Sequence, residues 1–389
     1  MKLTSFYFVF RYKAKNNKGN LNMEDTDKYI LWLNNIQGIT YKIFKHLMRH
    51  FKDTKNIYKS SYSSLAKTKI KEELINAILK SQSIELNYYV NILAEKNINF
   101  ISILNENYPK DLKELDNPPL GIYIKGTDNI DKFINISIVG ARKCSEYGIL
   151  TTLRFSKYLA EKGINIISGM AKGIDYFAHK GALEANGITT AVLGSGINIC
   201  YPKENIDIYN KINEKGIFIS EYFLNTHPKP YFFPMRNRII SSISLATIVV
   251  EAGDRSGSLI TADNALENGK DVFSVPGNIT SKLSYGTNNL IKQGAYPITD
   301  PSEVLEILGI KETKVPEKIQ KTQTKKVIDI NLLASDEKLI YDCINFEPIT
   351  IDYICNKLSK NLEQINYNLV ILELKGLIKR LPGGRYVLS

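Results

Sequence analysis

The chain has 389 residues and a formal net charge of +11, with 43% hydrophobic and 23% charged residues. This length predicts two or three domains, and no apolar run is long enough to cross a bilayer, which excludes a membrane-spanning protein. Nine of the eleven excess positive charges lie in residues 1–20 and 311–326. Any anion-binding site elsewhere must therefore be a local patch.

Residues 1–24 lack the pattern of a signal peptide, and we predict a disordered tail in which either Met1 or Met23 is the start. Four scattered cysteines without a Cys-x-x-Cys pair predict a cytoplasmic protein without disulfides. The histidines do not cluster, so no metal site is expected. We place His46 and His50 on the outside of a basic helix.

Residues 25–104 predict a helical domain. Apolar residues at helical spacing on both sides of a turn at residues 37–40 resemble a helix-hairpin-helix, whose turn can hold a DNA phosphate. The second glycine of that turn is missing, which favours a purely structural bundle.

Residues 105–310 alternate regularly between apolar strand segments and amphipathic helix segments. This alternation predicts an α/β domain with an extended, Rossmann-like, doubly wound sheet. Its predicted strands are residues 136–140, 164–168, 190–194, 216–220, 246–251 and 271–275, with an added strand at 121–126.

The turns after the first three of these strands have the composition of phosphate-binding turns. Each contains glycine or serine before a helix, and a helix start offers free N–H groups and a positive dipole end. Arg142 and Lys172 add full positive charge to two of the turns. The predicted anion-binding residues are Gly140, Arg142, Ser168, Gly169, Lys172, Ser195 and Gly196.

The segment 227–238 alternates basic and aromatic residues between prolines, a composition typical of loops that bind single-stranded nucleic acid. We expect Phe233 to point inward and Tyr231 or Phe232 to be exposed. Further on, Ser256 and Gly257 open a helix and form another candidate anion site.

Several polar residues in this region have structural explanations that need no catalysis. Asp175 lies at a helix start, where capping accounts for it, and His179 is expected to be a hydrogen-bonded packing residue. Glu251 and Asp254 lack the companions of an acid–base site, so structural roles are favoured. The first turn lacks the Gly-x-Gly-x-x-Gly spacing of a dinucleotide site, so no cofactor is expected.

Residues 311–329 read as a charged linker, and residues 330–389 as a winged-helix domain of three helices and a closing hairpin. Winged helices bind DNA or dock proteins. The third helix here has few Lys or Arg, and only a slight preference for DNA remains.

Taken together, the motifs resemble those of the DNA-processing protein A (DprA/Smf) family. They follow the family order over about residues 108–308, and the flanking units resemble its sterile-alpha-motif-like and winged-helix domains. The matching segments are 138–142, 168–175, 191–196, 201–202, 220–221, 233–240, 250–253, 256–262, 275–277 and 286–291.

The resemblance implies a non-enzymatic mediator that binds and protects incoming single-stranded DNA and loads the RecA recombinase during natural transformation. It also implies a homodimer formed through the α/β domain, with its surface among residues 260–295. Arg142 and Lys172 would be the principal DNA contacts, the glycine and serine turns would form the backbone cup, and Arg236, Asn237 and Arg238 would form its far wall.

Two other functions remain as alternatives. A phosphoribohydrolase-like enzyme would carry a Pro-Gly-Gly-x-Gly-Thr-x-x-Glu turn, which residues 251–258 lack. A winged-helix transcription regulator would bind duplex DNA tightly through residues 330–389. We predict single-strand binding through residues 105–310 instead.

Overall fold

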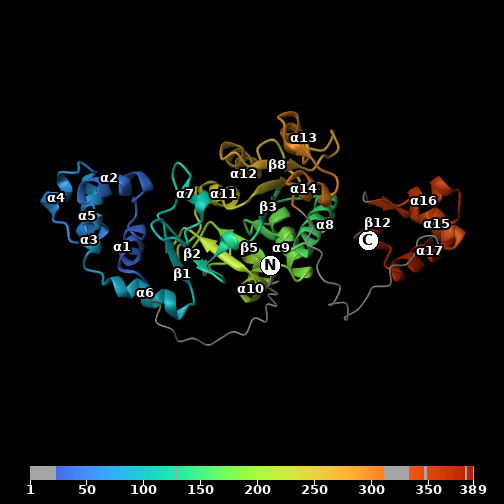
Figure 1. The fold of residues 1–389 in the computed structure, drawn as a ribbon. Helices are drawn as coiled ribbons and strands as arrows, with labels where there is room; N and C mark the ends of the chain where they lie inside the picture. Colours follow the sequence, from blue (N-terminus) through green and yellow to red (C-terminus); the bar gives the residue numbers. More distant parts are fainter. Residues whose placement is uncertain (1–22, 128, 311–332, 346–347, 382, 389) are drawn as a thin grey trace, which may run out of the picture.

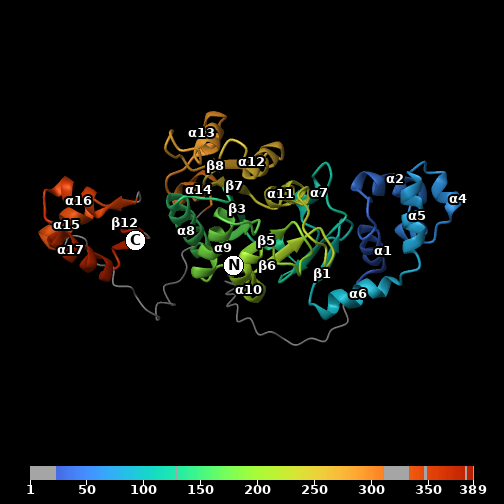
Figure 2. The ribbon, with the colours of Figure 1, turned by 180° about the vertical axis from the view of Figure 1, so that it is seen from behind.

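The computed structural model describes residues 23–127, 129–310, 333–345, 348–381 and 383–388. Within this part of the chain, the main feature is a sheet of nine strands in the order β1-β2-β6-β5-β4-β3-β7-β8-β9 (Figures 1 and 2). Its strands are β1 (Asn99–Ser102), β2 (Gly121–Lys125), β3 (Asn135–Val139), β4 (Asn165–Ser168), β5 (Thr189–Leu193), β6 (Ile217–Ser220), β7 (Ala246–Val249), β8 (Asp271–Ser274) and β9 (Tyr296–Pro297).

The strands from β3 to β9 pair in parallel, whereas β1 and β2 join the β6 edge as antiparallel strands. From β3 the chain proceeds outward through β4 and β5 to β6, and then returns to place β7 on the other side of β3. Ligands of doubly wound sheets bind where the strand order reverses, beyond the carboxyl ends of the strands. The predicted α/β architecture is confirmed, and its reversal point lies between β3 and β7.

Helices cover both faces of this sheet because its strands are apolar on both sides. Ile136 and Ile138 of β3 pack with one layer of helices, and Val139 packs with the other. The first layer contains α8 (Glu146–Glu161), α9 (Ile174–Glu184) and α14 (Pro301–Ile307). The second contains α10 (Ile206–Lys215), α11 (Phe232–Ser242), α12 (Gly257–Glu267) and α13 (Tyr285–Lys292).

The N-terminal helices lie beyond the β1 edge (Figure 1). One continuous buried cluster includes Trp32 of this unit and Phe218 of the sheet, so the two parts share a hydrophobic core. Asn34 and Asn35 each donate from Nδ2 to the Tyr123 hydroxyl at 3.2 Å. The helices are α1 (Asp25–Asn34), α2 (Tyr41–Phe51), α3 (Thr54–Tyr58), α4 (Tyr62–Ala66), α5 (Glu72–Ser81) and α6 (Leu86–Glu95).

The predicted helical segment 25–104 differs from the structure at its end, where β1 pairs with β2 and extends the sheet. A segment of four residues is too short for periodicity to distinguish a strand from the end of a helix. Short elements complete this region: α7 (Lys110–Lys113) and the 3-10 turns η1 (Ile130–Lys132) and η2 (Lys203–Asn205).

The C-terminal unit has a hydrophobic core of its own and the predicted winged-helix fold. It consists of α15 (Ser335–Tyr341), β10 (Ile349–Thr350), α16 (Ile351–Leu358), α17 (Leu362–Leu374), β11 (Ile378–Leu381) and β12 (Arg385–Leu388). The predicted tail at 1–24 and linker at 311–329 lie almost wholly outside the described residues. Among the helices that are described, none is long and apolar enough to span a membrane.

Candidate nucleic-acid interface

A cleft of about 780 Å³ opens at the reversal point of the sheet. Three segments form its walls: the turn that follows β3, the first two turns of α11 and the start of α12. Gly140 and Arg142 come from the first wall, Asn237 from the second, and Ser256 and Gly257 from the third. The fold therefore brings six of the twelve predicted DNA-binding residues, Arg236 among them, to one surface from segments spread over residues 140–257.

The turn that carries Arg142 is held by close backbone packing against the next turn. The Ile174 N–H donates to the Ala141 carbonyl at 3.2 Å. Gly173 has φ +74°, and a Cβ there would lie 2.3 Å from the Ala141 oxygen. Only glycine allows this approach. The Arg142 side chain remains exposed, so its guanidinium is free for a ligand in the cleft.

An aromatic pair lines the cleft beside Arg142. The Phe233 and Tyr201 rings stack with centroids 5.5 Å apart and an interplanar angle of 29°. The Arg142 guanidinium carbon lies 5.7 Å from the Phe233 centroid, within the range of a cation–π contact. Tyr201 is 46% exposed. The surface thus offers a flat apolar face next to a positive charge.

The expected orientation of Phe233 is wrong. Phe232 is the buried ring, and it stacks on Tyr222 at 3.9 Å, while Phe233 lines the cleft and Tyr231 is 58% exposed. Because α11 begins at Phe232, neighbouring residues point about 100° apart rather than to opposite sides. The sequence did not fix where the helix begins.

Two further cations line the cleft that the sequence analysis did not single out. Lys143 and Arg255 are both exposed and flank the predicted residues Arg142 and Ser256. In the sequence, their position beside two glycine-containing turns was the signal that could have identified them as cleft residues. With Arg142 they place three positive charges around the aromatic pair.

The start of α12 faces the same cleft. Ser256 caps the helix by accepting from the Ser258 N–H at 3.4 Å, and Gly257 is exposed with open space beside it. The Asn237 side chain spans the two walls by donating to the Gly257 carbonyl at 3.1 Å. This helix start adds a positive dipole end to the three cations.

The first two predicted phosphate cups are filled by carboxylates of the protein itself. Glu251 accepts from the Ser145 N–H at 2.9 Å and from its hydroxyl at 2.5 Å, and so holds Ser145, the residue that caps α8. Asp175 Oδ2 accepts from the N–H groups of Gly169 and Ala171 at 3.1 and 3.3 Å. Both carboxylates have structural roles, but Asp175 does not cap α9 as predicted, because its bonds go to the turn before that helix. These N–H groups are therefore not available to a phosphate.

The remaining cup residues are buried and do not line the cleft. The Ser168 hydroxyl donates to the Ile138 carbonyl at 2.7 Å. Ser195 is 2% exposed, and the Gly196 N–H donates to the Thr226 carbonyl at 2.8 Å. The backbone-cup role expected for Ser168, Gly169, Ser195 and Gly196 is therefore corrected, because buried N–H groups find internal partners.

The predicted far wall is also corrected. Arg236 does line the cleft, but it is only 4% exposed, and its Nη1 donates to the carbonyls of Gly169 and Val192. Arg238 does not line the cleft, and it pairs with Glu221, whose two carboxylate oxygens lie 2.7 Å from its Nη2. Of these three residues, Asn237 offers the accessible polar group.

Buried charges stabilise the floor beneath the cleft. Burial raises the pKa of Asp175, and the nearby Arg236 guanidinium counteracts this shift. Burial lowers the pKa of Arg236 to about 10, so its charge persists at neutral pH. The His179 ring is fully buried and bonds through Nδ1 to the Thr189 hydroxyl at 2.7 Å, which confirms its packing role.

Lys172 is exposed, as expected, but it is engaged in an ion pair with Glu204. Both side chains are more than half exposed, at 52% and 64%. The hydrogen bond from Lys172 lowers the pKa of Glu204. Lys172 lies outside the residues that line the cleft, so its contact with a ligand there requires it to leave Glu204.

Comparisons with known families agree with this architecture. The family described as DNA recombination-mediator protein A matches residues 99–309, and the DprA winged helix domain matches residues 330–384. The match of the first family covers more than half of the chain and includes all of the elements that form the cleft.

Similar proteins and structures carry the same names. Protein Smf of Escherichia coli (strain K12) is 36% identical over 293 residues, which cover 75% of this chain and 78% of that protein. The DNA processing protein DprA of Streptococcus pneumoniae is 42% identical over 204 residues, covering 52% of this chain and 72% of that protein.

Two solved structures are also similar. The crystal structure of DNA processing protein A from Streptococcus pneumoniae has a TM-score of 0.62 at 32% identity, covering 73% of this chain and 98% of that chain. A structure described for the single-stranded DNA binding mode of DNA processing protein A from Helicobacter pylori has a TM-score of 0.50 at 28% identity. The match covers 54% of this chain and 95% of that chain. The chain therefore belongs to the DNA recombination-mediator protein A family, a family of DNA-processing proteins that are not enzymes and whose members are named DprA or Smf.

Proposed function

We propose that this protein binds single-stranded DNA in the cleft at the reversal point of its sheet. The observation that carries the proposal is the stacked pair Tyr201 and Phe233 surrounded by Arg142, Lys143 and Arg255. Aromatic faces stack bases of any sequence, and the neighbouring cations neutralise the sugar–phosphate backbone. Among the relatives, the Helicobacter pylori protein is described as binding single-stranded DNA.

Single strands fit this surface better than duplexes. Bases of a duplex are stacked on each other and expose only their edges, whereas unpaired bases can place a face on Phe233 or Tyr201. Affinity should therefore be higher for single strands and should depend strongly on salt.

We further propose that the protein protects incoming DNA and loads RecA onto it during natural transformation, as a cytoplasmic homodimer. Exposed apolar side chains on and near α12 and α13 support a protein-binding surface within residues 260–295. They are Ile260, Leu266, Ile279 and Tyr285, which are 38%, 49%, 91% and 60% exposed.

The two alternative functions have weaker support. An enzyme would need a free acid or base in the cleft, but the Glu251 carboxylate is only 3% exposed and accepts from the Ser145 hydroxyl at the start of α8. A transcription regulator would read duplex DNA with α17, yet this helix contains two glutamates and no Lys or Arg. Helices that enter the major groove rely on such basic residues.

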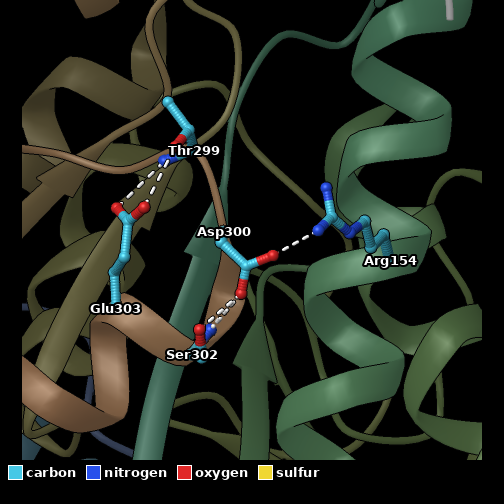
Figure 3. Close-up of polar contacts among 5 residues, drawn as sticks. All are labelled: Arg154, Thr299, Asp300, Ser302 and Glu303. Carbon is cyan, nitrogen blue, oxygen red and sulfur yellow. Dashed lines mark hydrogen bonds and ion pairs between the residues drawn. The ribbon is translucent and has the colours of Figure 1, made fainter.

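The test compares Arg142→Gln with a matched control in the full-length protein. Arg154→Gln removes the same charge from α8, where Arg154 pairs with Asp300 at the start of α14 (Figure 3). Arg154 does not line the cleft. Fluorescence anisotropy with single- and double-stranded oligonucleotides over a salt series gives the affinity and its salt dependence.

We expect Arg142→Gln to weaken single-strand binding by about 10-fold or more, the cost of one charged hydrogen-bond contact, and to flatten the slope against log salt by about 0.7. Lys172→Gln should weaken it less, because Lys172 must first leave Glu204. Equal affinity of wild type and Arg142→Gln, or a preference for duplex DNA, would refute the proposal.

A further inference from the structure

The exposed side of α2 carries a line of basic side chains. Lys42, Lys45 and Arg49 follow each other at spacings of three and four, and Lys52 caps the end of the helix. Residues at these spacings share one side of a helix. All four are exposed, while Phe44 and Leu47 are buried on the opposite side. We call these four residues the α2 basic face.

This face is not explained by the stability of the helix. The first turn of α2 contains Lys42 and no acidic residue, although the positive dipole end disfavours a cation there. Cations spaced three or four residues apart also repel each other. Within the described part of the chain, none of the four forms an ion pair, and Lys45 lies over the Tyr41 ring at 5.3 Å.

The local excess of charge extends beyond the helix. Residues 41–59 contain six basic residues and one acidic residue, Asp53. The Asp53 carboxylate caps α3 by accepting from the Lys55 N–H at 3.1 Å. The nearest carboxylate in the sequence is therefore committed to a helix cap, and the α2 basic face remains available to an anionic partner.

This face is connected to the DNA-binding cleft through neighbouring elements. Helix α7, which follows the helical unit in the chain, packs against α11. The start of α11 forms a wall of the cleft through Phe233 and Asn237. In both views of the molecule, α7 lies between α2 and α11 (Figures 1 and 2).

We propose that the α2 basic face is a second contact surface for the backbone of the same DNA strand that occupies the cleft. The inference rests on the proposed function, because it takes the polyanion to be DNA. The eleven residues from Lys42 to Lys52 span about 15 Å, which matches about four phosphates at the spacing of a stacked strand.

The experiment separates the two surfaces by oligonucleotide length. In the full-length protein, Lys42, Lys45, Arg49 and Lys52 are all replaced by Gln. The matched control replaces Lys67, Lys69, Lys71 and Lys80 by Gln, which are exposed residues of the same helical unit. Binding of oligothymidylates of about 5 and about 30 nucleotides is measured by anisotropy over a salt series.

We expect the α2 variant to bind the short oligonucleotide like wild type, because the cleft alone holds it. The long oligonucleotide should bind at least about 10-fold more weakly, with a salt slope reduced by up to about 2.8, or 0.7 for each lost phosphate contact. The control variant should retain most of the affinity and slope for both lengths.

The proposal is overturned if the α2 variant binds the long oligonucleotide like wild type, or if the control variant loses as much affinity. Lys45→Glu alone gives a second measurement with a single exposed substitution, and it should lower only long-oligonucleotide affinity. Failure of the proposed function has a different signature, since Arg142→Gln would then leave binding of the short oligonucleotide unchanged.

Discussion

Acidification from pH 7 to pH 5 should destabilise this protein through His179. Burial lowers the pKa of the His179 imidazole from 6.5 to about 3, and the nearby Arg236 charge lowers it further in the same direction. Its Nδ1 bonds to the Thr189 hydroxyl, and its Nε2 has no hydrogen-bond partner among the described residues. The ring is therefore neutral in the folded state.

The direction and size of this loss of stability follow from the linkage between proton binding and folding. Below pH 6.5 the unfolded chain binds a proton at this position and the folded state does not, so stability is present above pH 6.5 and is lost as the pH falls toward 3. With these two pKa values, the loss is about 2 kcal/mol at pH 5, and about 5 kcal/mol when the titration is complete.

The assay is urea unfolding of wild type and of His179→Gln at pH 7 and pH 5. The variant is less stable at pH 7, but it should lose about 2 kcal/mol less than wild type on acidification. His50→Gln is the control, because it replaces an exposed histidine of α2 and leaves His179 in place. Parallel pH dependence of wild type and His179→Gln would refute the reasoning.

Three further outcomes are expected. Glu204→Gln frees Lys172 and should strengthen single-strand binding by about 2- to 5-fold in anisotropy titrations. The control Glu184→Gln breaks the exposed pair with Lys180 and should not change this affinity. Equal effects of the two substitutions would argue against a role of Lys172 in DNA binding. Gly173→Ala places a Cβ against two carbonyl oxygens at φ +74°, so it should lower the unfolding free energy by about 2–3 kcal/mol and weaken DNA binding. Gly163→Ala, at φ +81° with open space around the Cβ, should lower the unfolding free energy by only about 1 kcal/mol. Similar losses of stability in the two variants would contradict the packing argument for Gly173. Deletion of residues 311–389, whose folded part has its own core, should leave single-strand affinity nearly unchanged, and its loss would favour duplex recognition by the winged helix.

The local pattern of the chain was sufficient to predict the α/β alternation, the winged helix and the position of Arg142. Apolar segments such as 136–140 and 246–251 are continuous because the parallel strands are covered on both faces. Arg142 follows the first of them directly, and the carboxyl end of a strand at the reversal point must face the ligand crevice. These are properties of neighbouring residues, which a sequence displays.

Which cations and N–H groups remain free was decided only by the tertiary structure. The Glu251 carboxylate fills the start of α8 through Ser145, a residue 106 positions away, and Arg236 reaches the carbonyl of Val192, 44 positions away. A helix start or an arginine has the same composition whether its partner is a ligand or a distant segment of the chain. Long-range packing supplies that partner, and it turned four predicted cup residues and two arginines into structural ones, while Phe233, Lys143 and Arg255 came to line the cleft.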